Sequence, residues 1–66
     1  MNKMLKLHDI REFNGVKKDE TNRASLMVIK GEEHWLPKSQ TEITDNHDGT
    51  WHIQMPEWLA DEKGLN

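Results

Sequence analysis

Apolar and polar side chains alternate in several short segments of the chain, and this period of two predicts a protein built mainly from β-strands. The alternation is cleanest over residues 50–55, where the apolar side chains are Trp51, Ile53 and Met55. In a strand these three side chains share one face, so we expect the segment to turn them towards the interior.

Residues 24–29 form the most apolar segment and end in two β-branched residues. This composition is typical of a strand that is covered on both faces. Residues 33–36 follow after a short connection at 30–32, in which Gly31 suits a left-handed backbone conformation. The two segments therefore predict an antiparallel hairpin.

Pro37 is expected to end the second strand of this hairpin, because proline has no N–H to donate to a neighbouring strand. We expect a tight turn at residues 37–39 and then a short edge strand at 40–44, which carries a single large apolar side chain. Residues 45–49 predict a turn, since they end in Asp-Gly, a pair typical of hairpin loops.

The amino-terminal third has a less regular pattern. Residues 3–13 favour a strand with a bulge or bend near residues 8–9, although a period near 3.6 leaves a helix open. The Asn-Gly pair at 14–15 predicts a turn, because both residue types tolerate positive φ. Residues 16–23 hold a single apolar residue and predict a solvated loop or an exposed hairpin end.

Pro56 predicts the start of a short helix, because its missing N–H costs nothing in the first turn. Gly64 suits the residue that ends this helix. A helix of two turns is not stable alone, so we expect it to dock on the sheet through Trp58 and Leu59. Leu65 is expected to fold back over the last turn.

These elements predict a single domain, residues 1–66, that is mainly β, with about five antiparallel strands and a short C-terminal helix. We expect a small, partly closed barrel or twisted sheet of the SH3-like or OB-like kind, with the helix over one end. An open sheet with the helix across one face is the alternative. The three tryptophans are expected mainly in the interior, although Trp35 lies on a strand that has two apolar faces.

Composition limits the partners. The formal charge is −3, which argues against a dedicated binder of duplex DNA. The chain has no cysteine, so disulfides and thiolate zinc sites are excluded. No apolar run approaches the ~20 residues of a membrane span, and the first residues do not form a signal peptide. We therefore expect a cytoplasmic protein without membrane contact.

No residue pattern indicates catalysis, a cofactor or a metal. Neither serine lies in a GxSxG motif, and a chain of this length has little room for a ligand pocket. The four histidines lack the spacing of a zinc site. The acidic turn at 45–49 has a histidine and a glycine where a calcium loop needs oxygen ligands. We expect no enzyme, no cofactor and no metal site.

Two segments resemble a known group of proteins. Trp-Leu-Pro-Lys-Ser-Gln at 35–40, followed by Pro-Glu-Trp-Leu-Ala-Asp-Glu-Lys-Gly-Leu at 56–65, is similar to small, mostly uncharacterised proteins of bacteriophage and prophage genomes. The resemblance covers the chain from Ala24 onward. It implies a small protein inside the infected bacterium, with gene neighbours that serve DNA replication and recombination, and it supplies no catalytic residues.

From this resemblance and the acidic surface we expect a non-enzymatic protein that binds a host or phage protein, as an accessory factor of DNA metabolism or an inhibitor of a host system. The rigid turn after Pro37 presents polar side chains at low entropic cost, and the edge strand can pair with a partner or form a homodimer. The expected partner-binding residues are Trp35, Lys38, Ser39, Gln40, Glu42, Asp45, Asp48, Asp61 and Glu62.

The alternative is a module that binds single-stranded nucleic acid, because small barrels stack bases on aromatic side chains beside a basic groove. The residues expected for this function are Lys17, Lys18, Arg23, Lys30 and Trp35.

Overall fold

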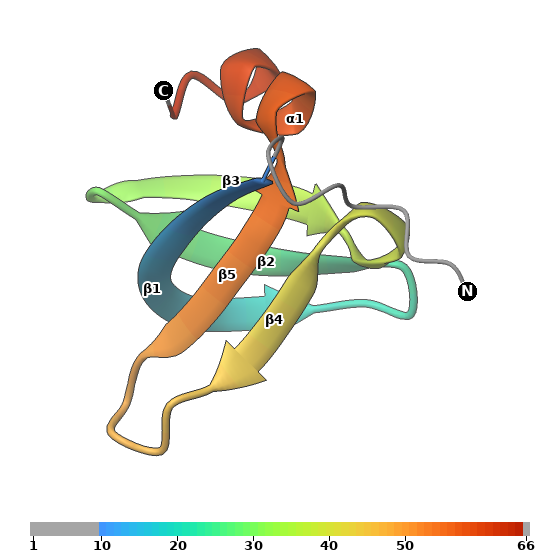
Figure 1. The fold of residues 1–66 in the computed structure, drawn as a ribbon. Helices are drawn as coiled ribbons and strands as arrows, with labels where there is room; N and C mark the ends of the chain where they lie inside the picture. Colours follow the sequence, from blue (N-terminus) through green and yellow to red (C-terminus); the bar gives the residue numbers. More distant parts are fainter. Residues whose placement is uncertain (1–9, 66) are drawn as a thin grey trace.

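The computed structural model of the protein describes residues 10–65, which form one antiparallel sheet and a short C-terminal helix (Figure 1). The elements are β1 (Ile10–Glu20), β2 (Ala24–Ile29), β3 (Glu32–Pro37), a 3₁₀ turn (Lys38–Gln40), β4 (Glu42–Asp45), β5 (Trp51–Pro56) and α1 (Glu57–Glu62). The strand order is β3-β2-β1-β5-β4, so β3 and β4 are the two edges. The predicted fold class is confirmed, and the sheet is open rather than closed into a barrel.

β1 is the central strand and is shared by two halves of the sheet. Its first half, from Ile10 to Gly15, pairs with β5, and its second half, from Val16 to Glu20, pairs with β2. Figure 1 shows how strongly the strand curves along its length. A Cβ atom at position 15 would lie 2.4 Å from the carbonyl oxygen of Val28, so only glycine fits where the backbones approach.

This arrangement corrects two predictions. The Asn-Gly pair at 14–15 is not a turn but lies within β1. Of the two alternatives for residues 16–23, the exposed hairpin end is confirmed and the loop is wrong for 16–20, which are strand. Only residues 21–23 connect β1 to β2. Asn-Gly favours a turn by its local conformation, yet here pairing with two distant strands decides the structure. The predicted bend at 8–9 lies outside the described residues, while 10–13 are strand and not helix.

The predicted hairpin of β2 and β3 is confirmed. The register pairs the two strands over their whole length. Lys30 and Gly31 both have positive φ, 56° and 80°, which gives a two-residue turn whose twist matches that of the strands.

A corner at residues 37–41 joins β3 to β4, which lie at opposite edges of the sheet. It contains the 3₁₀ turn at Lys38–Gln40, and the Thr41 hydroxyl donates to the carbonyl oxygen of Pro37 at 2.9 Å. A segment this short spans at most about 18 Å even when fully extended. The sheet must therefore curl until its two edges approach each other at the corner, although no strand pairing closes it. The predicted edge strand at 40–44 is confirmed as β4.

The inner face of the curled sheet carries the core. The buried apolar side chains of this core come from the sheet, from α1 and from the segment after it: Met27, Ile29, Leu36, Ile53, Met55, Leu59, Ala60 and Leu65. The helix α1 lies over one end of the sheet (Figure 1). The Leu65 N–H donates to the carbonyl oxygen of Ala60 at 2.8 Å, which confirms that Leu65 folds back over the last turn of the helix.

Two tryptophans contradict the expectation of an interior position. Trp35 is 43% exposed and Trp58 is 56% exposed, whereas Trp51 is half-buried against the core. Neighbouring side chains on a strand point to opposite faces, so Trp35 faces outward because Leu36 is buried. Neighbouring helical residues point about 100° apart, and α1 docks through Leu59 while Trp58 stays in solvent.

Candidate protein-binding surface

The outer face of the half-sheet formed by β1, β2 and β3 carries a continuous apolar surface. Residues paired directly across an antiparallel sheet point to the same face, with Cβ atoms about 5 Å apart. The register makes three such pairs, which link all three strands. We call their members the outer patch: Val16 with Val28, Leu26 with Trp35, and Ala24 with Pro37.

The alternation along β2 explains why this surface faces outward. Ser25, Met27 and Ile29 are buried on the inner face, so the residues between them point to the other side. Val16 is 48% exposed, close to the exposure of Trp35. Among the described elements, α1 packs mainly against β5 and β1, and no second layer lies on the patch. Residues 24–29 were predicted to be covered on both faces; within the described residues the inner face is buried and the outer face is half-buried.

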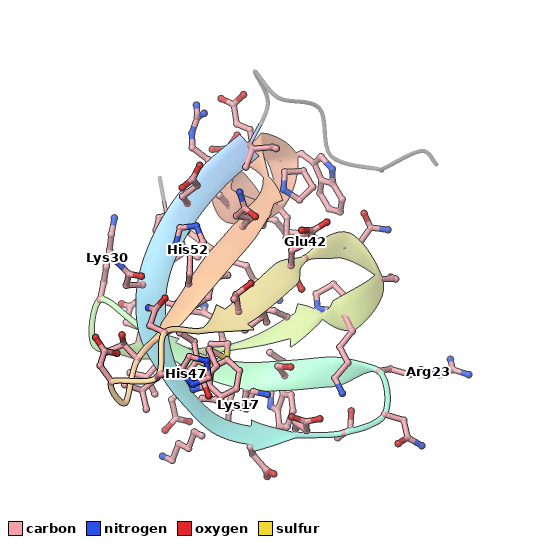
Figure 2. The ribbon with its side chains drawn as sticks, turned by 60° about the horizontal axis from the view of Figure 1, so that its bottom comes forward. Lys17, Arg23, Lys30, Glu42, His47 and His52 are labelled. Carbon is pink, nitrogen blue, oxygen red and sulfur yellow. The ribbon has the colours of Figure 1, made fainter. Side chains whose placement is uncertain are left out.

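The other half of the same sheet has a polar outer face. The polar side chains that β1, β5 and β4 turn outward are Glu12, Asn14, Glu42, Thr44, His52 and Gln54. Figure 2 shows Glu42 and His52 on this half, and His52 Nε2 lies 3.2 Å from Glu12 Oε1. A polar outer face is the usual arrangement for an antiparallel sheet with one solvated side. One apolar pair, Ile10 with Pro56, shares this face at the end next to α1, and Pro56 is buried. The exposed large apolar side chains of the described strands, Val16 and Trp35, both lie in the outer patch.

Charged residues of both signs border the outer patch. Lys18 lies at a bulge in β1 and forms an ion pair with Glu33 of β3. Asp19 pairs with Leu26 in the register and so shares its face, and Arg23 is exposed in the loop that follows. These four residues carry no net charge between them. An apolar centre with a polar rim is the usual anatomy of a protein interface.

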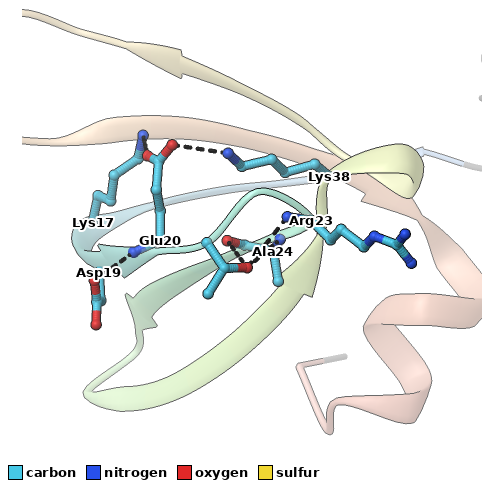
Figure 3. A network of polar contacts seen from close by, with 7 residues as sticks. Lys17, Asp19, Glu20, Arg23, Ala24 and Lys38 are labelled. Atoms are coloured by element: carbon cyan, nitrogen blue, oxygen red, sulfur yellow. Dashed lines mark hydrogen bonds and ion pairs between the residues drawn. The ribbon is translucent and has the colours of Figure 1, made fainter.

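A network of ion pairs lies at the corner, on the inner side of the sheet (Figure 3). Lys17 Nζ donates to Oε1 of Glu20, and Lys38 Nζ donates to Oε2, each at 2.8 Å. The hydrogen bond from Lys17, followed by that from Lys38, lowers the pKa of Glu20 to about 2. The Lys17 ammonium also lies 4.1 Å from the centre of the Trp51 ring. The network fastens the 3₁₀ turn to the end of β1.

A cavity of about 240 Å³ opens beside this network. Its lining residues are Lys17, Glu20, Ser25, Lys38, Thr41 and Ile43. It lies where the edges of the sheet approach each other, and it is smaller than the ~300–1,000 Å³ of typical ligand sites. The space therefore fits a small chemical group rather than a large cofactor.

The structure distributes the residues predicted to bind a partner over several surfaces. Trp35 belongs to the outer patch, whereas Lys38 turns to the corner network. Ser39 and Gln40 lie in the 3₁₀ turn, Glu42 and Asp45 on β4, Asp48 in the β4–β5 loop, and Asp61 and Glu62 on α1. In that loop Thr50 donates to the carboxylate of Asp48, which lowers the Asp48 pKa. These residues do not form one continuous acidic surface.

The residues predicted to bind nucleic acid are also dispersed. Lys17 points to the inner face, while Lys18 pairs with Glu33 on the outer side. Arg23 and Lys30 flank the two ends of β2, about 20 Å apart at ~3.3 Å per strand residue, and Figure 2 shows them on opposite sides of the molecule. Lys30 Nζ donates to the carbonyl oxygen of Leu65 at 3.0 Å, so it holds the C-terminal segment. No single basic groove joins these side chains.

The outer patch contains three large apolar residues that were not among the predicted binding residues, namely Val16, Leu26 and Val28. The signal was present for two of them, because a strand with apolar residues at every position has an apolar outer face whether or not anything covers it. Val16 had no such signal, since its segment resembled a solvated loop.

The described residues contain no group of three or more histidine, aspartate or glutamate side chains placed to hold a metal ion. Between residues 10 and 65, no helix is long and apolar enough to span a membrane. Comparisons with protein-family models, with curated proteins and with solved structures find no significant match to this chain.

Proposed function

We propose that this protein is a non-enzymatic binding module that docks a partner protein on the outer patch. The observation that carries the proposal is the outer patch, in which Val16 and Trp35 are exposed and the outward residues of β2 are half-buried, with no second layer of the described elements over them. Burying apolar area contributes roughly 25 cal/mol per Å², so a partner that covers this face gains affinity from it.

The composition of the outer patch supports a protein as the occupant. Trp35 combines a large apolar area with a polar N–H, and tryptophan is among the residues that contribute most at protein interfaces. A standard interface covers about 800 Å² on each partner, which is roughly a fifth of the 4401 Å² surface of this protein. The outer patch would form the centre of such an interface, and its charged border would form the rim.

Net charge favours a different protein as the partner at the outer patch, over a second copy of this chain or a nucleic acid. Two copies of a chain with charge −3 repel each other at long range, and so do this chain and a nucleic acid. The rim itself is neutral, so it neither attracts nor excludes a particular charge. We therefore assign the outer patch to a neutral or basic protein surface.

The biological setting of the proposal comes from the resemblance of residues 35–40 and 56–65 to phage and prophage proteins. In that setting the partner is a host or phage protein, and this protein acts as an accessory factor of DNA metabolism or as an inhibitor of a host system. Both roles require a docking surface and neither requires catalytic residues.

The test compares three bait proteins in capture from bacterial lysate, before and after nuclease treatment: wild type, Trp35→Glu and Thr44→Glu. Thr44 is the matched control, because it is exposed on the polar outer face of the same sheet. We expect a protein that is retained by wild type and Thr44→Glu, is lost with Trp35→Glu, and survives nuclease. Equal capture by Trp35→Glu, or loss on nuclease treatment, would contradict the proposal.

Sedimentation velocity of the same three proteins tests whether a second copy of this chain binds the outer patch. We expect each to sediment as a monomer at micromolar concentration. A dimer that only Trp35→Glu abolishes would show that the outer patch serves self-association instead.

A further inference from the structure

The cavity at the corner has features of a binding site that are independent of the outer patch. It lies on the inner side of the sheet, and its lining comes from β1, β2, the corner and β4. Three kinds of group meet there: two ammonium groups, one carboxylate and two hydroxyl-bearing side chains.

The charges of the corner network do not cancel. The ammonium groups of Lys17 and Lys38 share the single carboxylate of Glu20, so the network keeps one positive charge in a chain whose net charge is −3. An ammonium group has three N–H donors, and each lysine gives one of them to Glu20. The remaining donors can bind a second anionic oxygen.

Both lysines are held in place before any ligand arrives. Glu20 fixes the two ammonium groups on either side of its carboxylate, and the Trp51 ring lies beneath that of Lys17. A flexible lysine side chain otherwise loses conformational entropy when a ligand orders it. Preorganisation of this kind favours binding because part of that entropy is already lost on folding.

Ser25 explains why a cavity exists at this position. It is the one buried polar residue in the described part of the chain, 2% exposed, and it pairs with Glu20 in the register on the inner face. The neighbouring inward positions on β2 and β3 carry Met27 and Leu36, which fill their space. The small serine leaves room next to the lysines and adds a hydroxyl donor at the edge of that room.

We propose that this cavity binds a small oxyanion, a carboxylate or phosphate group, held between Lys17 and Lys38 and bordered by Ser25. The volume of about 240 Å³ restricts the occupant to a small molecule or a single anionic group. Glu20 positions the lysines but also competes with the ligand for their donors.

The test is an NMR titration of ¹⁵N-labelled protein with inorganic phosphate, and separately with acetate, at constant ionic strength. We expect saturable amide shifts that are centred on Lys17, Ser25, Lys38 and Thr41. The phosphate and acetate arms show which oxyanion the site prefers. Absence of saturable shifts with both anions, or shifts spread evenly over surface lysines, would overturn the proposal.

Four variants separate binding from a purely structural role of the network. Lys38→Met and Ser25→Val should each weaken binding at least about tenfold, the first by removing a charged donor and the second by replacing the hydroxyl with apolar groups that narrow the cavity. Lys18→Met, which changes a lysine on the outer side, should leave the affinity unchanged. Glu20→Gln should bind phosphate about tenfold more tightly, because the amide oxygen can still accept from the lysines, whereas the charged carboxylate that competes with the ligand is gone.

Folding of each variant is checked by its thermal melt. If Lys38→Met is unfolded, Ser25→Val and Glu20→Gln still test whether the cavity binds the oxyanion. The proposal predicts a lower affinity for the first variant and a higher affinity for the second. Equal affinity of Glu20→Gln and wild type, or undiminished binding to Ser25→Val, would contradict the proposal. Trp35→Glu should bind the oxyanion as wild type does, so a failure of the protein-binding function leaves this site testable.

Discussion

At position 15 the chain has room for a hydrogen atom and nothing larger. The Cβ atom of any other residue would meet the carbonyl oxygen of Val28 at 2.4 Å and the Ile29 side chain at 3.1 Å. The first of these is backbone in the paired strand β2, which cannot move without disturbing the sheet. One residue thus sets how closely the two halves of the sheet approach each other.

We expect Gly15→Ala to lower the free energy of unfolding by about 1–3 kcal/mol, because it forces the backbones of β1 and β2 apart. The measurement is urea unfolding followed by circular dichroism. Asn14→Ala is the matched control, since Asn14 is exposed on the same strand, and it should change stability by about 0.5 kcal/mol or less. Equal stability of the two variants would contradict the close approach.

A second prediction at the scale of the residue concerns pH. The folded protein holds the pKa of Glu20 at about 2, below its ordinary value of 4.5, because Lys17 and Lys38 donate to its carboxylate. A depressed pKa means that the stabilising contribution is complete above about pH 4.5 and is lost as pH falls towards 2. We therefore expect the difference in urea midpoint between wild type and Glu20→Gln to shrink across that window. A difference that does not change with pH would show that Glu20 is not held by the two lysines.

At the scale of the element, α1 shows which side chain attaches the helix. Leu59 is 2% exposed, whereas its neighbour Trp58 is 56% exposed. We expect Leu59→Ala to cost about 2–5 kcal/mol and Trp58→Ala to stay within about 0.5 kcal/mol of wild type. Thermal unfolding of the two variants measures this. A larger loss for Trp58→Ala would mean that the helix docks through its indole.

Elements with a local signal could be predicted from the sequence. The two-residue turn at 30–31, the alternation over 50–55 and the helix after Pro56 all depend on residues close together in the chain. β1 could not be predicted in the same way, because its second half is polar and becomes a strand only by pairing with β2. The Asn-Gly pair within it gave a local signal that long-range pairing overrode.

The candidate surface was predictable in part for a related reason. Trp35 was predicted to contact a partner, but sequence alone does not show which face of its strand is covered. A strand that is apolar on both faces predicts cover on both sides, but its composition does not show whether the outer cover comes from the same chain or from a partner. The difference depends on whether another layer packs there, and this becomes visible only when the elements are assembled. The corner network likewise joins Lys17 and Lys38 from segments that are distant in sequence.

At the scale of the whole molecule, the distribution of charge separates the proposed function from its alternative. The basic residues lie on different faces and ends of the sheet, in a chain of net charge −3. We expect a labelled oligonucleotide without a terminal phosphate to cause no saturable change in tryptophan emission at low salt, because no groove collects its backbone phosphates. Quenching that weakens steeply with added salt would support nucleic-acid binding instead.

The most direct test of the proposed surface is the urea unfolding of the double variant Leu26→Ser/Trp35→Ser beside Leu36→Ala. Trp35 and Leu36 are neighbours on β3 that face opposite sides of the sheet. We expect the double variant to lose about 1 kcal/mol, the value of a cross-strand pair, and Leu36→Ala to lose about 2–5 kcal/mol. If the double variant loses as much as Leu36→Ala, the outer patch is part of the folded core and is not open to a partner.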